Sequence, residues 1–167
     1  MQTEAEKIVD LLTDLDATVG TAESLTGGRL AAALTQAPGS SAVFAGGVVS
    51  YHTRVKVEVL GVAEETTETD GVVSESCARQ MADGVRRVLG TTYGISTTGV
   101  AGPDTQEGKA VGTVFVGAAG PEGTKVEELA LDGDRDEIQR ASVEAALSAL
   151  QEMISSAGRS PEDSTLR

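Results

Sequence analysis

The sequence predicts an α/β fold, a three-layer α/β/α domain built around a mixed, mostly parallel sheet. Apolar residues recur with helical spacing over residues 3–14, 74–89 and 134–155. Short runs rich in valine, threonine and glycine lie between these segments and are typical of strands, and alternating helices and strands favour a parallel sheet covered on both faces. Two further strands flank the turn at residues 120–123, which indicates an antiparallel hairpin at one side.

The first elements follow from local patterns. Residues 3–14 predict an amphipathic helix, with Thr3 and Glu6 spaced as a capping box. Residues 17–22 predict a short strand that turns through a small polar loop into a helix over residues 28–36. That helix must end before Pro38, because the residue preceding a proline is displaced from helical geometry.

The middle of the chain predicts one strand and two helices. Residues 42–51 are almost free of polar side chains, so we expect a strand that is buried on both faces at the centre of the sheet. Residues 52–61 contain alternating valines that are also compatible with a strand, but Leu60-Gly61 resembles the end of a helix, so we expect a short helix. The acidic, threonine-rich residues 63–71 predict a loop or a frayed turn. Residues 74–89 predict a helix that starts at an N-capping serine and carries Cys77 on its buried side as a core residue.

The last third completes the fold. Residues 91–98 predict another strand, and residues 111–118 and 125–131 form the expected hairpin. Residues 134–155 predict the final helix. We therefore expect residues 1–156 to form one domain, followed by a disordered tail over residues 157–167, which are polar and contain a proline.

Composition excludes several classes of function. The chain has 26 acidic and 13 basic residues, a net charge of −13, which disfavours binding to nucleic acid or to an anionic membrane. No apolar run is long enough to cross a bilayer and the start of the chain lacks the features of a secretory signal, so we expect a cytoplasmic protein. The acidic, lysine-poor and aromatic-poor composition suggests a halophilic protein, in which concentrated salt screens self-repulsion.

Metal and disulfide chemistry are also disfavoured. The chain has one cysteine, Cys77, and one histidine, His52. A single cysteine excludes an internal disulfide and multi-cysteine metal clusters, and a single histidine excludes the common histidine-rich zinc sites. We expect neither a metal nor a cofactor.

The loop after the first strand carries the candidate nucleophile, Ser24. Gly27 and Gly28 would let the backbone approach a ligand closely, and we expect the first amides of the following helix to be free donors for an anion or an oxyanion. The alternative is that Ser24 caps the helix and the glycines only make a turn. No lysine follows the glycines, so the loop does not match the phosphate-binding loop of nucleotide kinases.

Strand ends supply the other candidates, because ligands of open α/β sheets bind beyond the carboxyl ends of the strands. A serine–histidine–carboxylate triad would have to use His52, which has no carboxylate nearby in the sequence to orient it. A pair of Ser24 and Lys56 fits better, since burial in a dry crevice and the neighbouring Arg54 would both lower the pKa of the Lys56 amine. The alternative for Lys56 is a solvated surface lysine.

Four basic residues could bind an anionic substrate in this acidic protein. They are Arg54, Lys109, Arg135 and Arg140. Guanidinium groups bind phosphate or carboxylate in a bidentate manner. For Arg135 and Arg140 the alternative is a solvated face of the last helix.

Several collinear motifs together resemble the CinA C-terminal domain family, whose stand-alone members include PncC-type nicotinamide-nucleotide amidases. The resemblance covers about residues 5–155 and includes a mixed sheet. The motifs are Ala22-Glu23-Ser24-x-Thr26-Gly27-Gly28, Pro38-Gly39-Ser40-Ser41, Gly47 through Ser50-Tyr51 with Lys56, Leu60-Gly61-Val62, Gly71-Val72-Val73-Ser74, Thr98-Gly99-Val100-Ala101-Gly102-Pro103, Val111-Gly112-Thr113-Val114 and Gly133-Asp134-Arg135.

The resemblance implies deamidation of nicotinamide mononucleotide to nicotinic acid mononucleotide and ammonia, without a metal, in pyridine nucleotide salvage. It implies that Ser24 is the nucleophile and Lys56 the general base. The other implied site residues are Tyr51, Ser41 and Thr98 in a polar network, Gly99 beside it, and Arg135 or Arg140 near the phosphate.

The sequence departs from the family at Thr105-Gln106, at Lys109-Ala110 and at Arg54, where some relatives have lysine. These departures bear on loop geometry and substrate affinity more than on the reaction.

Two alternatives for the function stay open. One is a non-catalytic nucleotide-binding or competence-associated module, and the other is an amidase for a free pyridine carboxamide. Members of the family often self-associate, so a homo-oligomer is compatible with the resemblance.

Overall fold

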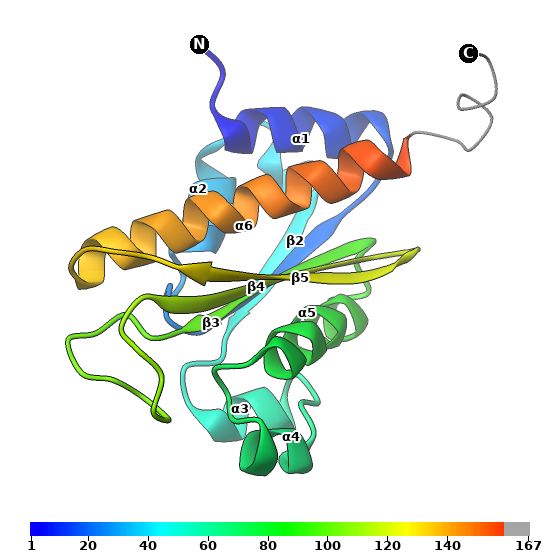
Figure 1. Ribbon diagram of the computed structural model, residues 1–167. Helices are drawn as coiled ribbons and strands as arrows, with labels where there is room; N and C mark the ends of the chain where they lie inside the picture. Colours follow the sequence, from blue (N-terminus) through cyan, green and yellow to red (C-terminus); the bar gives the residue numbers. More distant parts are fainter. Residues whose placement is uncertain (159–167) are drawn as a thin grey trace, which may run out of the picture.

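A single five-stranded sheet organises the computed structural model, which describes residues 1–158 (Figure 1). The strand order is β2-β1-β3-β4-β5, with β1 parallel to β2 and β3, and β4 antiparallel to β3 and β5. All the described strands except β4 therefore share one direction, and the predicted mixed, mostly parallel sheet is confirmed. The strands are β1 (Val19–Glu23), β2 (Phe44–Val49), β3 (Tyr93–Gly99), β4 (Thr113–Gly120) and β5 (Gly123–Ala130).

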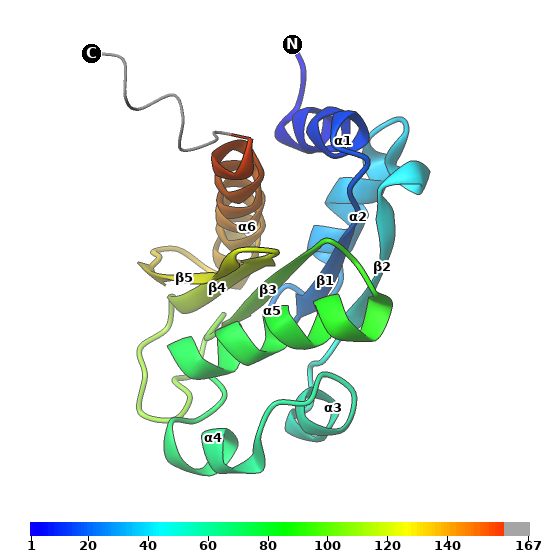
Figure 2. The same cartoon turned by 90° about the vertical axis from the view of Figure 1, so that its right-hand side faces the viewer.

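Helices cover both faces of this sheet, as the predicted three-layer arrangement requires. Figure 2 shows α1, α2 and α6 on one face and α5 on the other, with the short α3 and α4 beyond α5. The helices are α1 (Glu4–Asp14), α2 (Arg29–Gln36), α3 (Thr53–Glu58), α4 (Glu64–Thr69), α5 (Glu75–Leu89) and α6 (Arg135–Ala157), and a 3-10 turn, η1 (Ser40–Ala42), precedes β2.

The core lies on both sides of the sheet. Ile8 of α1 and Leu150 of α6 are fully buried in the larger cluster between these helices and the strands. Met81 and Cys77 of α5 are fully buried in a second cluster on the opposite face, so Cys77 is a core residue as predicted. Burying one such large apolar side chain contributes about 1.5–3 kcal/mol, and this burial fixes both helical layers on the sheet.

Two predictions about elements are wrong. Residues 42–51 were expected at the centre of the sheet, but β2 lies at its edge and its residues alternate between half-buried and exposed. The interior positions belong to β1, β3 and β4, which are buried along almost their whole length. Residues 63–71 were expected to be a loop or a frayed turn, but they contain α4, which is held to α5 by a hydrogen bond from Gln80 Nε2 to Thr66 Oγ1 of 2.8 Å.

The ends of the other elements match the sequence signals. Thr3 and Asp134 begin α1 and α6 with complete capping boxes, and Ser74 caps α5. The predicted helix over residues 52–61 is present as α3. Beyond Gly158, the predicted disordered tail falls outside the described residues, and none of the helices within residues 1–158 has the length and apolarity needed to cross a bilayer.

Candidate functional site

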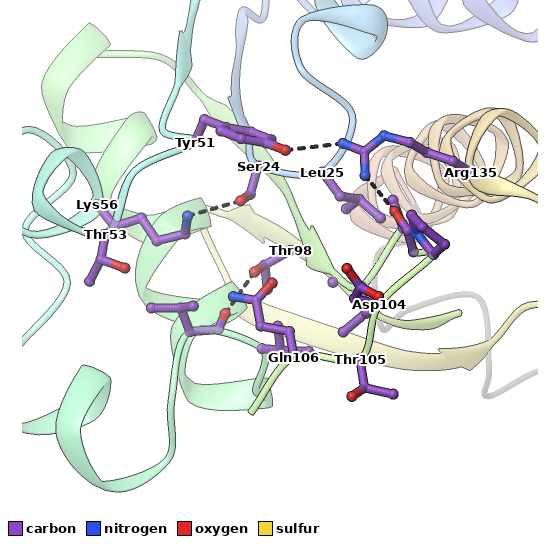
Figure 3. Close-up of a pocket in the computed structure, with 17 residues that line it drawn as sticks. Ser24, Leu25, Tyr51, Thr53, Lys56, Thr98, Asp104, Thr105, Gln106 and Arg135 are labelled. Atoms are coloured by element: carbon purple, nitrogen blue, oxygen red, sulfur yellow. Dashed lines mark hydrogen bonds between the residues drawn. The ribbon is translucent and has the colours of Figure 1, made fainter. Parts of the chain in front are cut away.

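A cavity of about 480 Å³ opens beyond the carboxyl ends of β1 and β3 (Figure 3). This is the position at which open α/β sheets bind ligands, and its size is typical of small-molecule sites. The residues that line it are Ser24, Leu25, Tyr51, Thr53, Lys56, Val72, Val73, Thr98, Gly99, Val100, Ala101, Gly102, Pro103, Asp104, Thr105, Gln106 and Arg135.

Ser24 and Lys56 face each other at the inner end of this cavity. Ser24 directly follows β1, and Lys56 lies on α3, which follows β2. The Nζ atom of Lys56 donates a hydrogen bond of 2.9 Å to Ser24 Oγ and another of 2.5 Å to the carbonyl oxygen of Ser50. The tertiary structure thus joins a hydroxyl and an amine that are separated by 32 positions in the chain.

Burial lowers the pKa of the Lys56 amine below its usual range. The side chain is only 1% exposed, and none of the ion pairs found within residues 1–158 involves it. The nearby Cys77 and Glu107 act in the opposite direction more weakly. A neutral amine has a lone pair that can accept the proton of Ser24.

Arg54 was expected to help lower this pKa, but it points away from the cavity. Its guanidinium pairs with Glu58, one turn further along α3, at 2.7 Å, and its side chain is 65% exposed. His52, the alternative base, caps α3 instead, since its Nδ1 accepts the backbone N–H of Arg54 at 3.1 Å. A triad built on His52 is therefore not present.

The loop that carries Ser24 is held by Glu23, a residue whose role the sequence analysis missed. Glu23 is 1% exposed, and its carboxylate accepts hydrogen bonds from the backbone N–H groups of Gly28 at 3.2 Å, Leu30 at 2.8 Å and Ala31 at 3.1 Å, and from Thr26 Oγ1 at 2.7 Å. A carboxylate placed against a helix N-terminus is favoured by the partial positive charge there. The signal in the sequence was an acidic residue at the end of a strand that otherwise has no charged side chain.

Glu23 therefore corrects the expectation that the first amides of α2 are free for a ligand. Gly27 and Gly28 do not line the cavity, and the amide of Gly28 is already bound to the carboxylate. The N-cap position of α2 is Gly28, with φ of 105°, so Ser24 is not the cap. The glycines shape a left-handed turn that presents Ser24, because both have positive φ.

Polar groups on the outer wall connect three segments. Arg135, at the start of α6, donates to the hydroxyl oxygen of Tyr51 at 3.0 Å and to the carbonyl of Gly102 at 2.7 Å. Thr98 Oγ1 donates to the carbonyl of Val72 at 2.6 Å. Its remaining lone pairs can accept a hydrogen bond from a ligand.

The loop between β3 and β4 forms the remaining wall and is tied to the start of α5. The carboxylate of Glu107 accepts from the backbone N–H of Val72 at 3.1 Å and of Val73 at 3.3 Å. Lys109 donates to the carbonyls of Val73 and of Asp70. Lys109, a candidate for anion binding, is therefore used within the protein.

Two other candidates also lie away from the cavity. Ser41 is part of η1, which precedes β2, so it lies at the opposite ends of the parallel strands. Arg140 pairs with Asp136 at 2.7 Å on the exposed side of α6. The candidates that the structure brings to the cavity are Ser24, Lys56, Tyr51, Thr98, Gly99 and Arg135. Within residues 1–158, no group of three histidine, cysteine or acidic side chains is arranged to hold a metal ion.

Comparisons with known proteins agree on one family. The family model described as the CinA C-terminal domain matches residues 1–154. A CinA-like protein of Frankia casuarinae is 50% identical over 88% of this chain, and a putative competence-damage inducible protein of Geobacillus is 45% identical over 93%. The chain spans 34% of the length of the first protein and 38% of the second, so these relatives contain much more than the region that matches.

Solved structures show the same fold. The competence/damage inducible protein CihA of Agrobacterium tumefaciens is 36% identical, with a TM-score of 0.85 over 92% of this chain and 97% of that one. A CinA superfamily protein of Klebsiella pneumoniae is 30% identical, with a TM-score of 0.88 over 92% and 99% of the two chains. On the family match, the relatives and the shared fold, this chain belongs to the CinA C-terminal domain family.

Proposed function

We propose that this chain is an amidohydrolase that converts nicotinamide mononucleotide into nicotinic acid mononucleotide and ammonia in pyridine nucleotide salvage. The observation that carries the proposal is the buried amine of Lys56, 2.9 Å from Ser24 Oγ at the inner end of the cavity. The substrate follows from the resemblance to the amidases of the family. The chemistry follows from the geometry, because a desolvated amine beside a hydroxyl is the arrangement that activates a serine nucleophile.

In the first step Lys56 takes the proton of Ser24 as Oγ attacks the carbon of the carboxamide. The hydrogen bond to the carbonyl of Ser50 uses one N–H of the neutral amine and leaves its lone pair for the hydroxyl. The tetrahedral intermediate then collapses, the C–N bond breaks, and Lys56 returns the proton to the leaving nitrogen. Ammonia departs and Ser24 carries the acyl group as an ester.

The negative oxygen of the intermediate needs a donor, and the amides at the start of α2 are held by Glu23. We assign this role to the backbone N–H of Leu25. Leu25 lines the cavity directly after the nucleophile, and within the described residues its amide has no acceptor. A water molecule, deprotonated by Lys56, hydrolyses the ester and releases the carboxylate product.

The outer wall supplies the contacts that orient the substrate. Arg135 is the arginine that lines the cavity, and its guanidinium provides donors for the phosphate. We assign to Thr98 and Tyr51 the polar contacts with the carboxamide. The hydroxyl of Thr98 already donates to Val72, so it faces the substrate as an acceptor for the carboxamide N–H.

The test is ammonia release from nicotinamide mononucleotide by the purified protein in high salt. We expect turnover by the wild type and at least a 1,000-fold loss in Ser24→Ala and Lys56→Met, because each removes one member of a unit that acts together. Ser41→Ala and Lys7→Met are matched controls outside the cavity and should keep activity. Intact-mass measurement should detect an acyl group on Ser24 in the wild type.

A folded wild type that releases no ammonia contradicts the proposal. Calorimetric binding of the nucleotide without turnover would favour the alternative of a non-catalytic binding module. Equal turnover of nicotinamide and its mononucleotide would favour an amidase for the free pyridine carboxamide, because contacts to the phosphate then contribute nothing.

A further inference from the structure

The cavity contains one carboxylate among its lining residues, that of Asp104. Its basic residues are Lys56 at the inner end and Arg135 at the outer wall. Within residues 1–158 the carboxylate of Asp104 makes no hydrogen bond to a side chain and forms no ion pair. An acidic side chain that has no partner and lines a cavity is available to a ligand.

The position of Asp104 in the cavity indicates which part of a ligand it meets. Asp104 belongs to the loop after β3, two residues beyond Gly102, whose carbonyl accepts a hydrogen bond from Arg135. Figure 3 shows its side chain to the right of Thr98 and below Arg135. Ser24, Thr98, Asp104 and Arg135 line the same cavity, so a substrate with its carboxamide at Ser24 and Thr98 and its phosphate at Arg135 leaves Asp104 to meet the middle of the molecule.

The middle of such a substrate has a distinctive charge. The ring nitrogen of a pyridine nucleotide is alkylated by the ribose, so the ring carries a full positive charge, whereas a free pyridine carboxamide is neutral at pH 7. A carboxylate attracts the first and gains nothing from the second. The carboxylate could also bind the hydroxyls of the ribose, and that contact would not depend on the charge of the ring.

We propose that Asp104 is a specificity-determining residue that recognises the cationic N-alkyl pyridinium ring. The proposal rests on the proposed function, since it takes the carboxamide to lie at Ser24. It adds a ring-charge criterion to substrate selection, in which Asp104 contacts the cation and Arg135 contacts the anion of a zwitterionic substrate. An acidic residue is then useful in a cavity that must also bind a phosphate.

The test compares two ligands that differ in ring charge. Nicotinamide mononucleotide has a cationic ring, and its reduced dihydro form has a neutral ring with the same ribose and phosphate. Dissociation constants are measured by calorimetry in the Ser24→Ala background, in which no turnover occurs. We expect the cationic form to bind about threefold to fivefold more tightly, as for other exposed ion pairs, and Asp104→Asn to remove this preference.

The ratio of the two constants isolates the ring, because any effect of the substitution on the phosphate is the same for both ligands. Asp14→Asn, at the end of α1, changes the net charge equally and should leave the ratio unchanged. An unchanged ratio in Asp104→Asn overturns the inference. If the ratio is unchanged because both ligands lose the same affinity, Asp104 contacts the ribose and not the ring. If neither ligand binds and the wild type releases no ammonia, the proposed function fails and the inference falls with it.

Discussion

Replacing Lys56 with methionine should change how the stability of the protein depends on pH. The substitution keeps an unbranched side chain of similar length but removes the amine. It removes two hydrogen bonds and leaves the carbonyl of Ser50 without this donor, which costs about 1–3 kcal/mol. It also removes the cost of burying an amine that is 1% exposed, so at pH 7 these effects partly offset each other.

The pH dependence has a definite sign. Burial lowers the pKa of Lys56 in the folded protein, whereas in the unfolded chain the pKa is about 10.4. Between these two values the unfolded chain binds a proton that the folded protein does not, so the free energy of unfolding rises with pH. The slope is at most about 1.4 kcal/mol per pH unit. The advantage of the wild type over Lys56→Met should therefore grow with pH between the two pKa values and level off above about pH 10.4.

The assay is urea unfolding of both proteins at fixed high salt between pH 6 and pH 10.5. Burial raises the pKa of the Cys77 thiol to about 11, which makes the folded protein less stable at high pH. This contribution of burial is present in both proteins, and only the part due to the neighbouring Lys56 differs between them. Lys7→Met is the matched control, since Lys7 is exposed on α1, and its difference from the wild type should be flat. A flat or falling difference for Lys56→Met would refute the reasoning that burial lowers the pKa of this amine.

Four further perturbations have expected outcomes. Glu23→Gln should lower the free energy of unfolding by about 1–3 kcal/mol and reduce kcat at least tenfold, because an amide supplies fewer acceptors to the start of α2. Denaturation measures the first effect and ammonia release the second, and an unchanged kcat would contradict the positioning role of Glu23. Gly84→Ala should destabilise by about 2 kcal/mol in urea unfolding, since its Cβ would lie only 1.9 Å from the carbonyl oxygen of Leu60, and wild-type stability would show that α5 can shift freely. Glu107→Ala should raise KM about threefold to tenfold with little change in kcat, because the loop between β3 and β4 loses its hydrogen bonds to Val72, just before α5. Steady-state kinetics measure both constants, and an unchanged KM would contradict a role of Glu107 in holding this wall of the cavity. Dialysis from about 1 M to about 0.01 M salt should lower the unfolding midpoint measured by circular dichroism. The Debye length grows from about 3 Å to about 30 Å, so the self-repulsion of a net charge of −13 is no longer screened. An unchanged midpoint would argue against a halophilic protein.

Tertiary contacts explain where the sequence predictions failed. β2 looked like a central strand because it is rich in valine and glycine, but strand order depends on pairing between distant segments. Arg135 and Arg140 lie near each other on α6, yet the first lines the cavity and the second pairs with Asp136 on the exposed side. Spacing along a helix does not say which face is opposite a cavity formed by other elements.

The sequence by itself determined most of the elements and the chemistry that they carry. Helix ends followed from capping residues such as Thr3 and Asp134, whose hydrogen bonds span three positions, and the hydroxyl and amine of the site followed from motifs. Only the tertiary structure decided that Lys56 is buried against Ser24 and that Glu23 holds the loop between strand and helix. The physical reason is range: capping and periodicity act within a few residues, whereas desolvation and the pairing of distant polar groups exist only once the layers have packed around the sheet.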